Sequence, residues 1–304
     1  MVTWWLDDNI LSSCHLVILS GEHVVSKVLV LRAPGINRDE DAAAAIEMAG
    51  GQPERIHVNR IVEGTVRLND YAMLVIPGGF SYGDHLGAGK LLAVDLAHRL
   101  QEQLAGFVAD GRPVLGICNG FQVLVKAGIL PGNEEPENQK TIEPAKQNIH
   151  GFPVLRFSSS EATLTDNTSG QFECRWVHLA SEPQSTCIFT KGLERTIEVP
   201  VAHGEGRFVA RDAATLNHLR EHGHVALRYV TADGSPTEYP ANPNGSDDNI
   251  AGICNLAGNV LGLMPHPEDA ILPTQHPRWT REAWRNEGDG LVIFRNAVWY
   301  AGSL

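Results

Sequence analysis

The chain has 304 residues, of which 43% are hydrophobic and 20% charged, a composition typical of globular proteins large enough to bury a proper core. Its formal net charge of -12 argues against a general binder of nucleic acid or anionic membranes, which would need a basic face. No apolar run approaches the roughly 20 residues of a membrane span, and the N-terminus lacks the basic region of a signal peptide, so we expect a cytoplasmic protein.

Short apolar segments alternate with helical ones through the first half of the chain. The expected strands, in chain order, are VLVLRA (28–33), RIHVNRI (55–61), YAMLVI (71–76) and GRPVLGI (111–117). The expected helices begin near Asn37, which with Glu40 resembles a capping box, then near Lys90, continuing to Asp110, and finally at Gly120. This alternation predicts an α/β fold, a mostly parallel sheet with helices on both faces, whose ligands bind beyond the carboxyl ends of the strands.

The second half of the chain follows a different pattern. Residues 131–150 are polar and contain prolines, which predicts a loop insertion. The expected antiparallel strands added to the sheet are FPVLRF (152–157), FECRWVHL (172–179), TCIFTKG (186–192), TIEVPVAHG (196–204), HVALRYV (224–230) and a hairpin of NIAGICN (249–255) with NVLGLMP (259–265). Helices are expected at 212–223 and 288–300. We therefore predict one domain over residues 27–304, preceded by an extension of unknown role at 1–26.

A cysteine flanked by glycines follows the strand at 111–117. The stretch Gly116-Ile117-Cys118-Asn119-Gly120 stands between a strand and a helix, which is the context of a nucleophile elbow. At a helix N-terminus the thiolate is favoured, and the amide of Asn119 could donate to an oxyanion. A small buried cysteine in a tight turn is an equally good interpretation of this motif alone.

A thiol nucleophile needs a base and a group that orients the base, and His266-Pro267-Glu268 is the best candidate. The prolines at 265 and 267 favour extended backbone, in which residues two apart point the same way, so Glu268 would lie beside His266. A lone histidine among 13 means little. A histidine and a glutamate at this spacing, after a strand and in a chain with a cysteine elbow, indicate a catalytic pair.

Other motifs in the chain have simpler interpretations than a catalytic one. Gly78-Gly79-Phe80 also ends a strand, and alone it would be a plain turn, but beside the elbow it is a candidate oxyanion loop. Gly83–Lys90 is one residue too long for a phosphate-binding P-loop, and no dinucleotide fingerprint or metal-ligand spacing is present. The five cysteines are scattered, with no CxxC pair, so those other than Cys118 are interpreted as structural.

Longer stretches of the chain resemble a known family. PGGFSYGD, GICNGFQ and GLMPHPE are similar to motifs of the class I (triad) glutamine amidotransferases, which have a flavodoxin-like fold. The resemblance runs from about residue 27 to 300. Within the family, the chain most resembles the glutaminase subunits of phosphoribosylformylglycinamidine synthase, in purine biosynthesis. The stretches that resemble these subunits in particular are APGINRDEDAAAAIEMAGG, GFSYGDHLGAG, CNGFQVLVKAGILPG, HGEGRF and NPNGSDDNIAGICNLAGNVLGLMPHPEDA. Residues 1–26 precede the usual start of the family, and the loop at 131–150 is not aligned with it and is assigned no role.

The resemblance implies roles for residues of this chain. Cys118 would be the nucleophile, His266 the catalytic histidine and Glu268 its partner. The residues implied in binding glutamine and its oxyanion are Gly78, Gly79, Phe80, Asn119 and Gln122. Glutamine would be hydrolysed through a Cys118 glutamyl thioester, and the ammonia passed to a large ATP-dependent synthase subunit acting on formylglycinamide ribonucleotide, with a small third subunit in many organisms. ATP and magnesium would bind the partner, and no metal or cofactor would bind this chain.

Three alternatives to this function are left by the sequence. The chain could serve a different synthase, which would keep the triad and change the flanking motifs. A stand-alone cysteine hydrolase or stress protein of the related elbow superfamily generally lacks the His-Pro-Glu segment that stands at 266–268. A catalytically silent regulatory subunit is disfavoured by the intact set of Cys118, His266 and Glu268.

Overall fold

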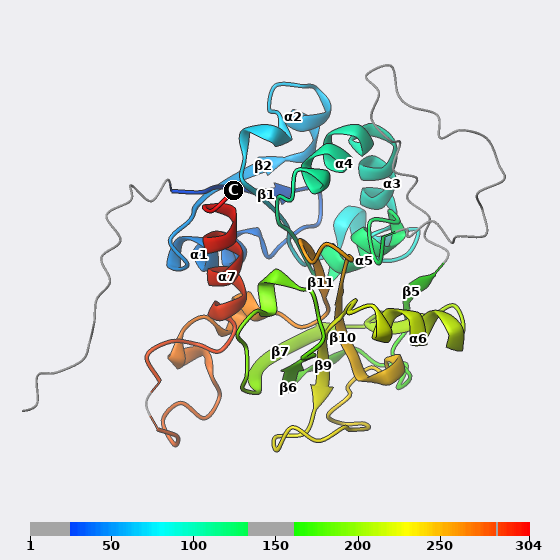
Figure 1. Ribbon diagram of the computed structural model, residues 1–304, viewed down its shortest axis with the longest axis vertical. Coiled ribbons are helices and arrows are strands. Elements are labelled where there is room, and N and C mark those ends of the chain that lie inside the picture. Colours follow the sequence, from blue (N-terminus) through cyan, green and yellow to red (C-terminus); the bar gives the residue numbers. More distant parts are fainter. Residues whose placement is uncertain (1–24, 133–160, 284) are drawn as a thin grey trace, which may run out of the picture.

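A nine-stranded sheet forms the centre of the protein in the computed structural model, which describes residues 25–132, 161–283 and 285–304 (Figure 1). Across the sheet the strands run in the order β2-β1-β3-β4-β11-β10-β9-β6-β7. Their bounds are β1 (Lys27–Arg32), β2 (Gln52–His57), β3 (Met73–Ile76), β4 (Val114–Ile117), β6 (Glu173–Ser181), β7 (Ile197–His203), β9 (Val225–Val230), β10 (Ile250–Cys254) and β11 (Val260–Leu263).

The sheet has a parallel half and an antiparallel half. Strands β2, β1, β3, β4 and β11 pair in parallel, whereas β10, β9, β6 and β7 are added in antiparallel pairs. A separate two-stranded sheet joins β5 (Ala162–Thr165) to β8 (Arg207–Ala210). The α/β fold with antiparallel strands added in the second half is therefore confirmed.

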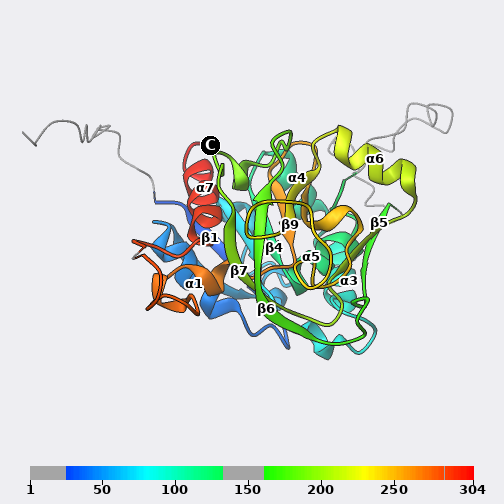
Figure 2. The same cartoon turned by 90° about the horizontal axis from the view of Figure 1, so that it is seen from below.

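Helices cover both faces of the parallel half, as the sequence predicts. The helices are α1 (Asp39–Met48), α2 (Val58–Val62), α3 (Lys90–Arg99), α4 (Gln101–Ala109), α5 (Asn119–Lys126), α6 (Ala213–Glu221) and α7 (Leu291–Ala301). Helices α1 and α7 lie together on one side of the sheet, and α3, α4 and α5 lie on the other (Figures 1 and 2). None of the helices in the described part of the chain is long and apolar enough to span a membrane.

The central parallel strands β3, β4 and β11 form from short, fully apolar runs, whereas the edge strand β2 is mostly polar. Every residue of β3 and β4 is buried, as expected of strands covered on both faces. Their carboxyl ends meet the two glycine-containing turns at 78–80 and 116–120, so burial of these strands brings the two turns to one edge of the sheet.

Several local predictions were wrong. The helix expected from Lys90 to Asp110 is divided into α3 and α4, because the backbone of Leu100 leaves the helical region. The strand expected at 55–61 ends at His57, which caps the short helix α2 with its side chain. Helix α1 begins at Asp39 with Arg38 as its N-cap, so Asn37 does not cap it. The segment expected as a strand at 186–192 contains a 3-10 helix, Ile188–Thr190.

Some predictions fall on residues outside the described part of the chain. Residues 1–24 and 133–160 are not described, and they include nearly all of the expected extension at 1–26, most of the loop at 131–150 and the strand at 152–157. The division into an extension and one domain over 27–304 stays a prediction.

Candidate active site

Cys118 occupies a strained turn between β4 and α5. Its backbone has φ 49° and ψ -104°, a positive φ that a non-glycine residue seldom adopts. Both flanking glycines are required by close packing: a β-carbon at Gly116 would lie 2.5 Å from Leu124 Cδ1, and one at Gly120 would lie 1.9 Å from the Ile76 carbonyl oxygen. The turn therefore has the geometry of a nucleophile elbow, with Cys118 at the N-cap of α5.

His266 and Glu268 form a buried pair after β11. The Nδ1 atom of His266 lies 2.7 Å from Oε1 of Glu268, and both side chains are almost fully enclosed. The backbone differs from the extended chain that the prolines predicted, because Pro267–Ala270 form a 3-10 helix, η6. The two side chains still meet, and the backbone N–H of His266 is fixed by donating to the Pro200 carbonyl of β7 (2.8 Å).

The cysteine and the histidine approach each other at Gly78. A β-carbon at Gly78 would lie 2.8 Å from Cε1 of His266 and 3.5 Å from Cβ of Cys118, so only glycine leaves room for both side chains. Within the described residues, the buried Nε2 atom of His266 has no hydrogen-bond partner. The ring nitrogen opposite the Glu268 contact is therefore free to exchange a proton with a thiol or a substrate.

The electrostatics around His266 favour its protonated form. Burial lowers the pKa of His266, but the negative charges of Glu268 and of the Cys118 thiolate outweigh burial and raise the pKa well above its usual value. An imidazolium beside Cys118 stabilises a thiolate, which is the reactive form of cysteine.

The loop Gly78-Gly79-Phe80 is held in place by the loop that follows β1. Ile36 and Gly79 form an antiparallel bridge. In it the Asn37 N–H donates to the Gly78 carbonyl (3.4 Å), and the Phe80 N–H donates to the Gly35 carbonyl (2.9 Å). The Gly79 N–H takes part in neither hydrogen bond. Gly79 has φ 140°, and a β-carbon there would lie 2.7 Å from the Gly35 carbonyl oxygen. The loop thus lies against Cys118 at Gly78, with the Gly79 N–H outside the bridge, and the Phe80 side chain is half exposed.

Asn119 and Gln122, on the first turn of α5, are tied to two neighbouring loops. Asn119 Nδ2 donates to Gln122 Oε1 (3.0 Å), and Asn119 Oδ1 accepts from the Ser81 N–H (3.2 Å). Gln122 Nε2 donates to the Glu205 carbonyl (2.7 Å). The structure therefore gathers all the predicted site residues at one edge of the sheet, and the side-chain amides of these two residues bind protein groups there.

The turn at 203–206 was not identified as part of the site from the sequence. His203 ends β7, immediately after Ala202, whose carbonyl oxygen lies 3.7 Å from Cys118 Sγ. The HGEGRF stretch was one of those that resemble the purine-biosynthesis subunits. Its contacts with the site, however, are made with residues far away in the sequence. No local periodicity or spacing could have revealed them.

One trio of potential metal ligands occurs among the described residues. Ligand atoms of His266, Glu268 and Asp269 lie within 4.8 Å of one another. The Asp269 carboxylate, however, pairs with Arg38 (3.1 Å), and the His266 contact to Glu268 is a hydrogen bond. Burial and the nearby Glu268 charge raise the pKa of Asp269 to about 6. His266 and Glu268 therefore belong to the catalytic triad, and Asp269 belongs to an ion pair with Arg38 beside it.

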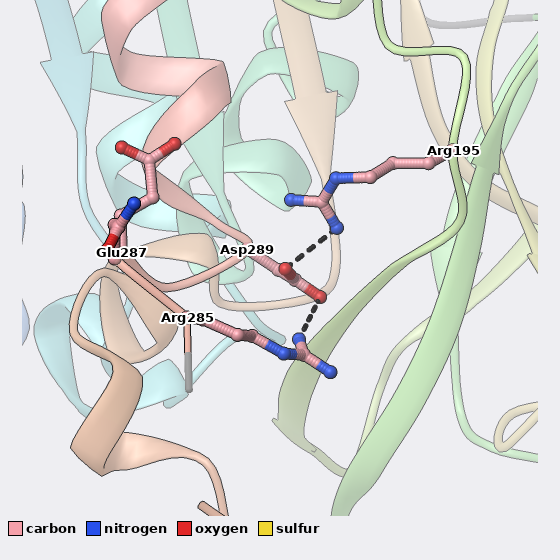
Figure 3. A pocket seen from close by; sticks show the side chains of 5 residues that line it. Arg195, Arg285, Glu287 and Asp289 are labelled. Atoms are coloured by element: carbon pink, nitrogen blue, oxygen red, sulfur yellow. Dashed lines mark hydrogen bonds and ion pairs between the residues drawn. The ribbon is translucent and has the colours of Figure 1, made fainter. Parts of the chain in front are cut away.

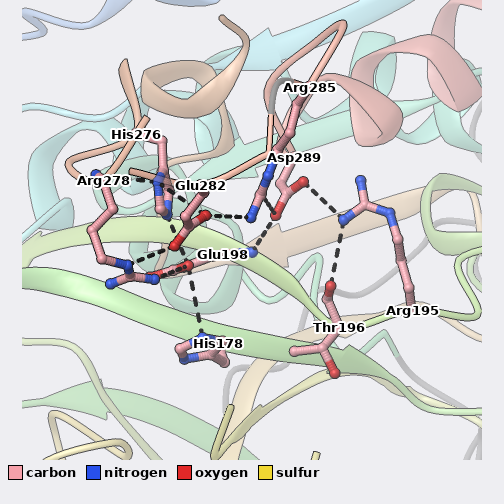
Figure 4. A network of polar contacts seen from close by, with 9 residues as sticks. All are labelled: His178, Arg195, Thr196, Glu198, His276, Arg278, Glu282, Arg285 and Asp289. Atoms are coloured by element: carbon pink, nitrogen blue, oxygen red, sulfur yellow. Dashed lines mark hydrogen bonds and ion pairs between the residues drawn. The ribbon is translucent and has the colours of Figure 1, made fainter. Parts of the chain in front are cut away.

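A pocket of about 550 Å³ is lined by Arg195, Arg285, Asn286, Glu287 and Asp289, none of which is a predicted site residue (Figure 3). Its charged groups pair with one another: the buried Asp289 accepts from Arg195 (2.8 Å) and from Arg285 (2.9 Å). The same ion pairs belong to a network in which Glu198 of β7 accepts from His276 (2.8 Å) and Arg278 (Figure 4). The network fastens the segment between η6 and α7 over β7, the edge strand of the sheet.

The family model for the CobB/CobQ-like glutamine amidotransferase domain matches residues 25–301. A cysteine elbow beside a buried histidine–glutamate pair, on a mostly parallel sheet, is consistent with this match. The chain belongs to this family and is a glutamine amidotransferase.

Relatives define a particular group within the family. The chain is 49% identical over 254 residues to the phosphoribosylformylglycinamidine synthase subunit PurQ of Treponema denticola, covering 81% of this chain and 88% of that relative. It is 43% identical over 276 residues to the protein of the same name from Dehalococcoides mccartyi, covering 90% and 97%. The solved structure of PurLQS from Thermotoga maritima matches with a TM-score of 0.64 and 31% identity, covering 91% of this chain and 99% of that one. The chain belongs to the PurQ group of glutamine amidotransferases.

Proposed function

We propose that this chain is the glutaminase subunit of a phosphoribosylformylglycinamidine synthase, with Cys118 as nucleophile and His266 and Glu268 as its acid–base pair. The observation that carries the proposal is the meeting of the strained Cys118 turn with a buried His266 whose Nδ1 is bound to Glu268 at 2.7 Å. Nucleophile, base and orienting carboxylate come from segments nearly 150 residues apart, and they converge beside glycine turns with amides available.

The reaction follows from these positions. The Cys118 thiolate attacks the side-chain amide carbon of glutamine, and the amides of Gly79 and Asn119 stabilise the oxyanion. His266 gives its proton to the leaving nitrogen as the C–N bond breaks, so ammonia departs and a glutamyl thioester remains. His266 then takes a proton from water, the resulting hydroxide attacks the thioester, and the C–S bond breaks to release glutamate. Glu268 keeps Nδ1 protonated throughout and stabilises the imidazolium in the steps in which His266 carries the second proton.

The ammonia needs an acceptor on another subunit. Ammonia is a nucleophile only while unprotonated, so a sheltered path to a synthase subunit is expected. We place ATP, magnesium and formylglycinamide ribonucleotide on that large subunit, and we expect a small third subunit in the complex. The matched PurLQS structure is a complex by its name, which supports a synthase partner. We place the assembly in the cytoplasm.

Glutamate release from glutamine tests the proposal. The full chain is assayed alone and with a candidate synthase subunit, ATP and formylglycinamide ribonucleotide, as wild type, Cys118→Ala and Cys187→Ala. Cys187 is also buried, but its thiol lies beside that of Cys254 and it precedes the 3-10 helix at 188–190, so its variant is the matched control. We expect activity with the partner in the wild type and in Cys187→Ala, and loss in Cys118→Ala. Absence of glutamate with the partner present, or full activity of Cys118→Ala, contradicts the proposal.

A further inference from the structure

The turn at residues 203–206, between β7 and β8, is anchored by two buried asparagines from distant parts of the chain. Asn167 Nδ2 donates to the His203 carbonyl (2.8 Å), and its Oδ1 accepts from the Gly206 N–H (3.0 Å). Asn244 Nδ2 donates to the Gly206 carbonyl (2.8 Å). Both asparagines are at most 3% exposed. Such buried, satisfied amides specify one conformation of the turn.

The imidazole of His203 lies inside this turn. Nδ1 lies 3.2 Å from Asn167 Oδ1, so it is the protonated nitrogen, and Nε2 faces Asn244 Nδ2 at 3.5 Å as an acceptor. A β-carbon at Gly206 would lie 2.4 Å from Nδ1 of His203, so the turn closes directly over the ring. Burial and the charge of nearby His266 lower the pKa of His203 to about 4, which agrees with a neutral ring.

The turn presents Glu205 to the active site. The Glu205 carbonyl accepts the 2.7 Å hydrogen bond from Gln122 Nε2, one helical turn after Cys118. The Glu205 carboxylate faces the Ala88 N–H (3.4 Å) and the Lys126 ammonium (3.9 Å). The turn thus joins the loop at 81–89 to α5 and fixes the amide of Gln122.

We infer that His203 is a positioning residue of the glutaminase site, which holds the 203–206 turn so that the Glu205 carbonyl orients Gln122 beside Cys118. The inference rests on the proposed function. His203 is not a second general base, because both of its ring nitrogens face asparagine groups that fix its tautomer. It acts on the bound glutamine through Gln122 and leaves the reactivity of the thiolate to His266.

Covalent labelling of Cys118 separates positioning from thiolate reactivity. The full chain, in complex with the synthase subunit, is treated with 6-diazo-5-oxo-norleucine, which must bind like glutamine to react, and separately with iodoacetamide, which needs only a thiolate. For His203→Ala we expect labelling by the diazoketone to slow about tenfold or more, as for a misplaced substrate, while labelling by iodoacetamide changes less than about twofold. KM for glutamine should rise more than kcat falls.

Three further variants control the result. His224→Ala removes a histidine that is 2% exposed and bonded to the Cys254 carbonyl, and it should leave both labelling rates unchanged. His203→Asn keeps a donor toward Asn167 and should recover part of the rate. In a double-mutant cycle, His203→Ala should add little to Gln122→Ala, because both remove the same link.

The outcomes that overturn the inference are distinct from failure of the proposed function. Equal slowing of both reagents in His203→Ala, full additivity with Gln122→Ala, or no slowing at all each overturn the positioning role. A wild-type complex in which the diazoketone labels no residue, or labels one other than Cys118, contradicts the proposed function instead.

Discussion

The two halves of the central sheet contribute to the site in different ways. The parallel half supplies the Cys118 elbow after β4, the glycine loop after β3 and, through β11, His266. The antiparallel half supplies β7, which lies against Cys118 and His266 at Ala202 and Pro200 and continues into the 203–206 turn. The reacting groups thus come from the parallel strands, and β7 and its turn fix their surroundings.

The difference is clearest in two buried histidines. Burial lowers the pKa of both rings. At His266 the Glu268 carboxylate and the Cys118 thiolate outweigh burial and raise the pKa, whereas at His203 the charge of His266 adds to burial and the pKa is lowered to about 4. Equal burial therefore produces opposite charge states, because the partners differ. One ring is suited to moving protons and the other to holding a turn.

The parallel half should be least tolerant of added volume at Gly120. A methyl group there would meet the Ile76 carbonyl at 1.9 Å and push α5 away from β3, so we expect Gly120→Ala to lower the free energy of unfolding by about 3 kcal/mol. It should also lower glutaminase activity, because the Cys118 turn moves with α5. Urea unfolding and the glutamate assay measure both effects.

Gly106→Ala is the matched control for that substitution. Gly106 lies within α4 with nothing within 4 Å of its missing β-carbon, so the variant should gain up to about 1 kcal/mol from helix propensity. Equal stability of the two variants would show that the close packing at Gly120 does not constrain the turn.

The two histidines should give opposite pH dependences of stability. Between pH 6.5 and about 4 the unfolded chain protonates His203 and the folded chain does not, so stability falls as the pH falls. From pH 7 to pH 5 this amounts to about 2 kcal/mol, and it should be absent from His203→Gln. His266 has a raised pKa, so its contribution is complete below pH 6.5 and is lost as the pH rises through its folded pKa.

Urea unfolding between pH 4.5 and 9 tests this contrast. His203→Gln should make the acid side of the wild-type stability curve less steep. His266→Gln should remove the loss of stability on the alkaline side, and it should also weaken the acid slope, because the charge of His266 is one cause of the lowered pKa of His203. An acid slope as steep in His203→Gln as in the wild type would contradict a neutral His203 in the folded chain, because the carboxylates with lowered pKa contribute equally to both.

The smallest effect is expected at the edge of the antiparallel half. Arg195→Ala removes a mostly exposed partner of Asp289, which keeps Arg285 and the Glu198 N–H, so the loss of stability should be below about 1 kcal/mol (Figures 3 and 4). Asp289→Ala removes the buried acceptor itself and should cost more, about 1–3 kcal/mol. Thermal unfolding distinguishes the two, and neither variant should change KM for glutamine.

The sequence by itself determined the central strands of the parallel half and the chemistry at their carboxyl ends. The apolar runs of β3 and β4 must be buried on both faces and lead into glycine turns, whereas the polar edge strand β2 was predicted with the wrong bounds. The positions of Cys118, His266 and Glu268 followed from motifs in which the residue types themselves carry the chemistry. The backbone at 266–268 is not extended as predicted, but Glu268 still lies beside His266 as predicted.

Only the tertiary structure decided which polar residues support the site. Asn167 and Asn244 lie in irregular segments and His203 at the end of β7, and they meet because the residues after β5, the end of β7 and the loop before β10 pack at one place. The same holds for the division of the 90–110 helix at Leu100 and the helical turn at 188–190. A buried hydrogen bond depends on the distance between groups that may be far apart in the chain, and local sequence patterns carry no record of that distance.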